Sequence, residues 1–452
     1  MTATIFTHTR LLRWLAAPLI AFAAVTAVLI ATRGSGSTSP QAVPSGSPIV
    51  AEGDRADAGP SAGLATLDTE ARIAAYQRLL REAPETAAYA ALGDAYYQRA
   101  RETGDPAYYS RSQRAFETAL ARDPEALDAT IGLGTLALAR HDFAAGLTLG
   151  ERAHRLEPGL ARPYTVIADG QIELGRYAAA AATIDRLARL KPNLAAYTRV
   201  SYLRELQGDL AGAAQAMRLA VSAGGSTEGS AYVSVLLGGL EFDRGHYAAA
   251  KRSYREALAL DPGYPPALAG RARVDAAEGR FDAAIDRYRR TVAVLPLPEY
   301  ATALAEVERA AGMEYAAERD LALVAAQAKL LEGSGVDVGV EQALFEADHG
   351  DPALAVAAGR GAWRRAPSVR SADAYSWALH AAGRTAAAER LSQQAMRLGS
   401  RTPSFLYHAG MIALDAGREA RARAYLGRLV RQSPRFHPIF GPRAEQAMEG
   451  LR

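Results

Sequence analysis

Residues 86–124 read TAAYAALGDAYYQRARETGDPAYYSRSQRAFETALARDP. Two small residues, Gly93 and Ser112, lie in its two halves, and the large aromatic Phe116 follows the second of them. The stretch ends at Pro124, and proline stops a helix because it lacks an N–H and its ring clashes with the preceding turn. This order of residues predicts two helices that cross closely at their small residues.

The same arrangement recurs along the chain with a fixed period. The prolines that end successive units lie 34 residues apart or close to multiples of that interval: Pro124, Pro158, Pro192, Pro262, Pro296, Pro367 and Pro434. A period of this size indicates one supersecondary unit that is copied along the chain. Because each such unit contacts mainly its neighbours, we expect a solenoid with a long concave face.

The positions of the unit that Gly93 and Ser112 occupy hold only Gly, Ala or Ser in every unit. With the proline numbered 32, position 8 is occupied by Gly93, Gly134, Ala168, Ser201, Gly238, Ala272, Ala305, Ala343, Ser376 and Gly410. Position 20 is occupied by Ser112, Gly146, Ala180, Ala213, Ala250, Ala284, Ala317, Ala355, Ala388 and Ala422. Small residues at both positions predict that the two helices of each unit touch backbone to backbone.

A turn signal separates the two helices in many units. Glycine recurs near position 15, at Gly175, Gly208, Gly245, Gly279, Gly383 and Gly417. Glycine at such a point ends a helix in the left-handed conformation. We therefore expect a helical hairpin in each unit, with its tight turn at this glycine.

The pattern resembles the tetratricopeptide repeat family, which has a bulky residue at position 4, Leu at 7, Gly or Ala at 8, Tyr at 11, Ala at 20, an aromatic at 24, Ala at 27 and Pro at 32. The first full unit matches it at Tyr89, Leu92, Gly93, Tyr96, Phe116, Ala119 and Pro124. The resemblance covers roughly residues 67–434. It implies an all-α right-handed superhelix of about ten helical hairpins.

The chain divides by composition into five parts. They are a transmembrane anchor or signal segment (1–33), a flexible Gly/Ser/Pro/Ala linker (34–65), a capping helix (66–85), the repeat array (86–434) and a C-terminal capping segment (435–452). The linker cannot bury enough apolar surface to order itself, and solenoids need caps at their exposed ends.

The first part carries a membrane signal. Trp14 to Thr32 is a 19-residue run without charge, close to the length that spans a bilayer as a helix. Arg10 and Arg13 precede the run, so the N-terminus is expected in the cytoplasm and the repeats outside it. The alternative is a cleaved signal peptide, which predicts secretion without an anchor.

Composition and motifs give no sign of catalysis. The 452 residues include no cysteine, which excludes disulfides and thiolate sites. The chain has no metalloprotease, nucleotide-loop or serine-hydrolase motif, and its eight histidines are scattered. We expect no catalytic residue, metal, cofactor or nucleic-acid partner, and carboxylate pairs such as Glu205 and Asp209 should be solvated. The alternative is an accessory subunit or hydrolase with an unrecognised site.

The resemblance implies that the first helix of each unit lines the concave groove. The groove candidates that we read from those positions are Asp94, Tyr97, Asp169, Glu173, Tyr202, Glu205, Phe242, Asp243, Arg273, Arg309, Trp377 and Tyr407. The first half of the groove is thus expected to be acidic with interspersed aromatics, which favours basic extended segments. The alternative is a merely hydrated inner surface. We expect a non-catalytic scaffold for extended segments or domains of envelope proteins.

Overall fold

The computed structural model describes residue 64 and residues 67–451. The predicted membrane segment at residues 14–32 and nearly all of the predicted linker lie outside these residues. No helix of the described part is long and apolar enough to cross a membrane.

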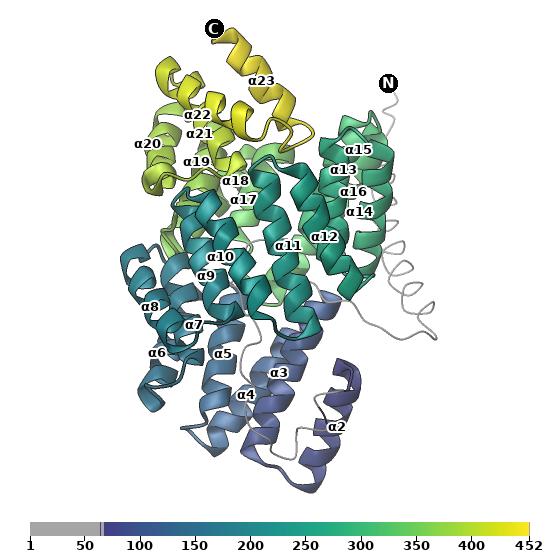
Figure 1. The fold of residues 1–452 in the computed structure, drawn as a ribbon, viewed down its shortest axis with the longest axis vertical. Helices are drawn as coiled ribbons and strands as arrows, with labels where there is room; N and C mark the ends of the chain where they lie inside the picture. Colours follow the sequence, from purple (N-terminus) through teal and green to yellow (C-terminus); the bar gives the residue numbers. More distant parts are fainter. Residues whose placement is uncertain (1–63, 65–66, 452) are drawn as a thin grey trace, which may run out of the picture. The chain divides into compact units, whose positions relative to one another are not determined.

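The described residues form helices and no strand, which confirms the all-α prediction (Figure 1). Twenty α-helices pair in chain order into ten hairpins, as the repeat count predicts. Hairpins 1–5 are α3 (Thr86–Thr103) with α4 (Ala107–Arg122), α5 (Leu127–Ala139) with α6 (Phe143–Leu156), α7 (Arg162–Glu173) with α8 (Tyr177–Leu190), α9 (Leu194–Leu206) with α10 (Leu210–Ala223), and α11 (Thr227–Asp243) with α12 (Tyr247–Leu260). Hairpins 6–10 are α13 (Pro265–Ala277) with α14 (Phe281–Val294), α15 (Pro298–Ala310) with α16 (Glu314–Gly333), α17 (Gly339–His349) with α18 (Pro352–Arg365), α19 (Val369–Ala381) with α20 (Thr385–Ala395), and α21 (Pro403–Asp415) with α22 (Glu419–Gln432). A short 3₁₀ helix, η1 (Met396–Leu398), follows α20.

Two further helices flank the hairpins. The first, α2 (Thr69–Glu82), packs against α3 and buries Ile73 and Tyr76. The last, α23 (Phe440–Gly450), contacts α21 and α22, and the ring of its Phe440 stacks on Tyr407 with centroids 4.9 Å apart. Both helices therefore cover apolar residues of the neighbouring hairpin.

The helices of a hairpin touch through their small residues, as predicted. The Ser112 hydroxyl donates a hydrogen bond to the Gly93 carbonyl at 2.8 Å. In hairpin 4 the direction reverses, and the Ser201 hydroxyl donates to the Ala213 carbonyl at 2.9 Å. A serine side chain is short. Its hydroxyl reaches a carbonyl of the other helix only where the two backbones lie close together.

The hairpin turns also have the predicted conformation. In eight hairpins the turn glycine has φ between +67° and +79°, the left-handed region that side chains avoid. Two hairpins are exceptions: His141 adopts φ +62° in hairpin 2, and Gly350 has φ −129° in hairpin 8. His141 is the one non-glycine residue with positive φ in the part of the chain that the structure describes.

Units five apart also contact each other, which the expectation of mainly neighbouring contacts did not include. The turns of hairpins 1–5 lie against the ends of the second helices of hairpins 6–10 (Figure 1). We call this row of contacts the seam. Its five contacts are Gly104 with Leu295, His141 with Asp337, Gly175 with Pro367, Gly208 with Gly399, and Gly245 with Gln432.

Three of the five seam contacts, at Gly175, Gly208 and Gly245, join backbone to backbone. A Cβ on Gly208 would lie 2.1 Å from the Gly399 carbonyl oxygen, and one on Gly245 would lie 2.1 Å from that of Gln432. By contrast, a Cβ on Gly383, in the uncovered turn of hairpin 9, would meet no heavy atom within 4 Å. The turn glycines with positive φ thus share a conformational role, and those of the first half have an additional steric role in the seam.

Hydrogen bonds reinforce part of the seam. The Tyr177 hydroxyl accepts from the Val369 N–H at 2.7 Å. The Arg140 side chain donates to the Gly335 carbonyl at 3.0 Å, and the Asp337 N–H donates to the Arg140 carbonyl at 3.0 Å. These bonds join residues more than 190 positions apart. The superhelix therefore completes a turn in five hairpins and stacks its second turn on its first.

The residues that cap the second helices differ between the two turns. In the first turn the caps of four hairpins are charged, and they are Asp123, Glu157, Lys191 and Asp261. In the second turn the corresponding caps are uncharged, and three of them are buried in the seam: Leu295, Ala366 and Ser433. The helix ends that dock are thus apolar or small, and the ends that face away are mostly ionic.

Replacing Gly208 by Ala tests the seam, with Gly383→Ala as its matched control. Both glycines have positive φ, +76° and +69°, so each substitution costs about 1 kcal/mol in backbone strain. Only Gly208→Ala also forces a methyl group into a carbonyl, and we expect it to lose at least about 2 kcal/mol more. The free energy of unfolding in urea measures both variants. Equal losses would contradict the seam.

Candidate functional site

A cavity of about 620 Å³ lies between the two turns. We call it the inner cavity. Residues from the first helices of hairpins 4–10 line it, so the predicted concave face is here covered by the opposite turn. Its aromatic lining consists of Tyr202, Tyr232, Tyr254, Tyr288, Tyr300 and Phe405. This volume is in the range of binding sites for small ligands or a few side chains.

Two of the carboxylates in the inner cavity are neutralised by basic neighbours. Arg273 donates to Asp243 at 3.0 Å, and its guanidinium lies 4.0 Å from the centre of the buried Phe242 ring. His408 Nδ1 lies 2.9 Å from an oxygen of Asp373, and both side chains are buried. Neither carboxylate is therefore available to a ligand without breaking an existing contact.

Glu205 differs from those carboxylates. Its side chain makes no hydrogen bond or ion pair with any residue in the range 67–451. Burial and, to a smaller extent, the nearby Asp243 raise the pKa of Glu205 to about 7 against the opposing effect of Arg370. The expectation that Glu205 and Asp209 are both solvated is wrong for Glu205, which is half-buried, whereas Asp209 is exposed and caps α10.

The predicted acidic row is largely paired within the chain. Asp169 forms a buried ion pair with Arg199 at 2.6 Å. Burial outweighs the opposing effect of Arg199 and leaves the pKa of Asp169 raised, at about 6. Glu173 accepts a hydrogen bond from the Tyr202 hydroxyl at 2.8 Å. The four predicted residues that the structure brings to the inner cavity are therefore Tyr202, Glu205, Asp243 and Arg273.

The other candidates lie outside the lining of the inner cavity. Asp94 and Tyr97 are half-buried in α3, where the Tyr97 ring lies 6.5 Å from that of Tyr109. Arg309 pairs with Glu314 at 2.9 Å.

Trp377 and Tyr407 belong to the packed interior of hairpins 8–10. The Trp377 indole N–H donates to Asp348 at 2.8 Å, and its ring stacks on His408 with centroids 4.4 Å apart. Tyr407 is 2% exposed and packs on α23. Both residues are positioned to support the fold around the inner cavity.

Sequence reasoning missed several residues of the lining. Tyr254 and Tyr288 occupy position 24, where the repeat expects an aromatic that packs in the hairpin, and they also border the inner cavity. The sequence signal for them is Tyr in place of Phe in two successive units, since a hydroxyl favours a polar border. Arg370 comes from the opposite turn, and its guanidinium lies 3.5 Å from the Tyr202 hydroxyl.

Glu306, His349 and His437 form the nearest approach to a metal site, but their hydrogen bonds oppose metal binding. Each imidazole presents Nε2 to one oxygen of Glu306 at 3.0 Å. Each Nδ1 faces N–H donors, from Arg309 for His349 and from the Phe440 backbone for His437. Nε2 must therefore carry the proton, and it cannot serve as a metal ligand in that tautomer.

Those contacts instead anchor the C-terminal segment to hairpins 7 and 8. Burial alone would raise the pKa of Glu306, but the two imidazoles lower it to about 2. No group of three or more metal-ligating side chains with suitable geometry occurs in the part of the chain that the structure describes.

The unpaired Glu205 makes the fold less stable at high pH. Its folded pKa of about 7 lies above the ordinary value of about 4.3, so folding favours the protonated form. The resulting loss of folding free energy is absent below about pH 4. It grows between pH ~4 and pH ~7 and is complete above pH ~7. Glu205→Gln should therefore raise the free energy of unfolding by about 2 kcal/mol at pH ~8 and by little at pH ~5.

Urea unfolding at the two pH values measures this effect. Glu125→Gln is the control, because Glu125 is exposed and caps nothing with its side chain. A gain for Glu205→Gln that is the same at both pH values, or a gain in the control, would contradict the assignment.

Comparison with models of known protein families identifies the family of this chain. Two models described as tetratricopeptide repeat match residues 241–307 in one case and residues 107–161, 165–228 and 370–435 in the other. No curated protein matches the chain.

Solved structures with similar helix arrangements are distant. The APC/C hetero-tetramer Cut9–Hcn1 is 14% identical, with 86% of this chain and 94% of that chain covered and a TM-score of 0.35. The human IFIT1 dimer with PPP-AAAA is 15% identical, with coverage of 80% and 78% and a TM-score of 0.38. YrrB, a TPR protein with an unusual peptide-binding site, is 15% identical, with coverage of 41% and 94% and a TM-score of 0.28. At such TM-scores these likenesses carry no argument about partners.

The family models together match more than half of the 452 residues. They agree with the ten hairpins, the small residues at the helix crossings and the left-handed turns. The chain belongs to the tetratricopeptide repeat family.

Proposed function

We propose that this chain is a non-catalytic scaffold that binds an extended segment of another protein, and that a basic side chain of that segment enters the inner cavity beside Glu205. The observation that carries the proposal is the half-buried Glu205 carboxylate, which has no hydrogen-bond or ion-pair partner among residues 67–451. Such a group costs stability and is retained most readily where a ligand offsets that cost.

The chemistry of the cavity favours a cation. Burial makes the charged form of Glu205 costly. The Coulomb attraction of an ammonium or guanidinium group beside it would offset that cost. Tyr254 and Tyr288 line the same cavity, and aromatic rings attract a positive charge placed over their faces. Asp243 and Asp373 already have basic partners, whereas Glu205 has none among residues 67–451.

An enzymatic role has less support. Asp373 and His408 form a pair of the kind that activates a serine, and Ser404 lines the same cavity. However, no hydrogen bond joins Ser404 to His408 among the described residues, and the stacking of His408 on Trp377 accounts for its position by packing. A scaffold needs no such contact.

We also propose that the repeats lie outside the cytoplasm, on envelope proteins, because Trp14 to Thr32 has the length and flanking charges of an anchor. The expected result is that external protease degrades the repeats in spheroplasts without lysis. Repeats that become sensitive only after lysis would contradict this location. Release into the medium would favour the secreted form.

Selection from a random library of short peptides tests the binding function on the full chain. We expect the selected peptides to contain Lys or Arg and to bind Glu205→Gln at least about tenfold more weakly than the unchanged chain. Binding should strengthen as pH rises from ~6 to ~8, since Glu205 loses its proton in that range.

The matched control is Glu125→Gln, which removes one exposed carboxylate outside the cavity. If the selected peptides bind Glu205→Gln and Glu125→Gln equally well, the assignment of Glu205 as a binding residue is wrong. If no peptide is selected by the folded chain, the scaffold function itself loses its support.

A further inference from the structure

The five contacts of the seam differ in their chemistry. At Gly104 the contact is apolar, with the side chains of Leu295 and Leu297. The contacts at His141, Gly175 and Gly245 are accompanied by the cross-seam hydrogen bonds of Arg140, Tyr177 and Gln432. At Gly208 with Gly399, no hydrogen bond crosses the seam between the described residues of the α9–α10 turn and those that precede α21.

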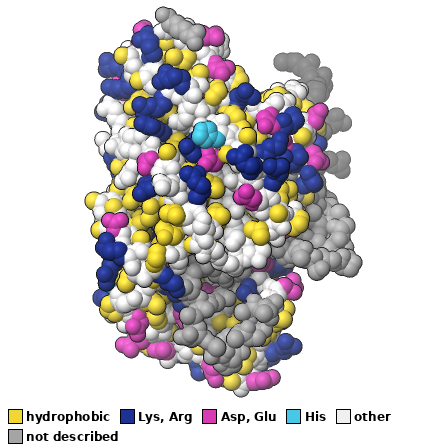
Figure 2. Space-filling model, viewed as in Figure 1, with side chains coloured by type: hydrophobic (Ala, Val, Ile, Leu, Met, Phe, Trp, Pro, Cys, Tyr) yellow, Lys and Arg dark blue, Asp and Glu magenta, His cyan; other side chains and the backbone are white. Residues whose placement is uncertain are grey.

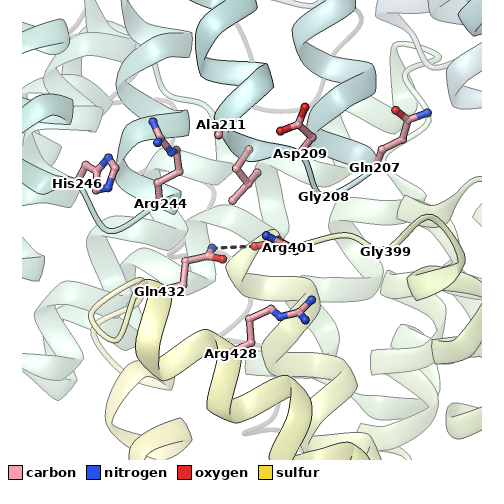
Figure 3. Close-up of a pocket in the computed structure, with 11 residues that line it drawn as sticks. Gln207, Gly208, Asp209, Ala211, Arg244, His246, Gly399, Arg401, Arg428 and Gln432 are labelled. Atoms are coloured by element: carbon pink, nitrogen blue, oxygen red, sulfur yellow. Dashed lines mark hydrogen bonds between the residues drawn. The ribbon is translucent and has the colours of Figure 1, made fainter.

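A hollow of about 600 Å³ adjoins this fourth contact (Figure 3). We call it the seam pocket. Hairpins 4 and 5 supply Gln207, Arg244 and His246, and the second turn supplies Arg401 and Arg428. Figure 3 shows that Arg428 projects into the space between the two turns. Apolar residues of the second turn, Leu398 and Phe405, pack against a first-turn cluster that includes Leu206. The pocket therefore brings basic side chains from both turns to a seam contact that has no hydrogen-bonded link between the described residues of its two loops.

The seam pocket carries an excess of positive charge. Glu241 accepts from Arg244 at 2.8 Å, while also contacting Arg218 and His246, so one carboxylate serves three basic groups. Arg401 and Arg428 have no acidic partner within residues 67–451. On the face drawn in Figure 2, basic side chains outnumber acidic ones around the exposed histidine.

The one acidic side chain of the lining, Asp209, is already engaged. Its carboxylate accepts from the Gly212 N–H at 2.8 Å and so caps α10. In Figure 3 this carboxylate points away from Arg428. Asp209 therefore lowers the positive charge of the pocket without neutralising the two arginines of the second turn.

We propose that the seam pocket binds a multivalent oxyanion, with phosphate or carboxylate groups, that bridges Arg401 and Arg428 on the second turn to the basic residues of the first. Arginine is suited to this task because its planar guanidinium donates two parallel hydrogen bonds to such groups. The ligand carries more than one anionic group, since the hollow is far larger than a single phosphate and its cations come from two turns. Binding supplies a polar link across the seam at the fourth contact.

Titration calorimetry on the full chain tests the site with two probes, inorganic tripolyphosphate and an oligoglutamate peptide. We expect one or both to bind, and the double variant Arg401→Gln/Arg428→Gln to bind at least about tenfold more weakly. The control is Arg384→Gln/Arg390→Gln, which removes the same charge from two exposed arginines outside the pocket. It should change affinity less than about twofold.

Amide hydrogen exchange gives a second measure, because a bridging ligand should slow exchange around Gly208 and Gly399 together. Preference for tripolyphosphate identifies a phosphate ligand, and preference for oligoglutamate identifies an acidic peptide. The proposal is overturned if neither probe binds at millimolar concentration, or if both double variants weaken binding equally. Glu205→Gln leaves this site intact, so failure here is separate from failure of the inner cavity.

Discussion

The close approach of carbonyl oxygens to the turn glycines is the constraint on which the rest of the structure depends. Gly175, Gly208 and Gly245 have positive φ and no room for a Cβ, so they serve the hairpin and the seam at once. Because successive hairpins repeat this contact in register, the second turn of the superhelix lies on the first. The inner cavity exists between these two turns, and its lining comes from both of them.

The sequence predicts the features that depend on one unit or on adjacent units. Small residues at the helix crossings, glycine at the turns and proline at the unit ends each act locally, so a single period reveals them. The seam joins residues about 190 positions apart and has no periodic signal of that kind. A weaker signal was present in the helix caps, which change from Asp123 and Glu157 in the first turn to Leu295 and Ala366 in the second.

The candidate site was partly predictable for the same reason. Position in the repeat identifies residues that point inward, and it placed Glu205 and Asp243 at the cavity. It does not identify their partners, which come from the next unit or the opposite turn. Asp169 illustrates the difference, because its role depends on Arg199 in the following hairpin, and that pairing turns an expected docking residue into a buried ion pair.

The seam also changes how such a chain must fold. An ordinary solenoid has only short-range contacts, so it can fray from either end and its stability is nearly a sum over repeats. Contacts that join the first hairpins to the last raise the contact order, and loop closure over such a distance slows folding. They also couple the two ends, so that hairpin 5 gains its full stability only after hairpin 10 has formed. This chain should therefore lose its structure as one cooperative unit rather than repeat by repeat.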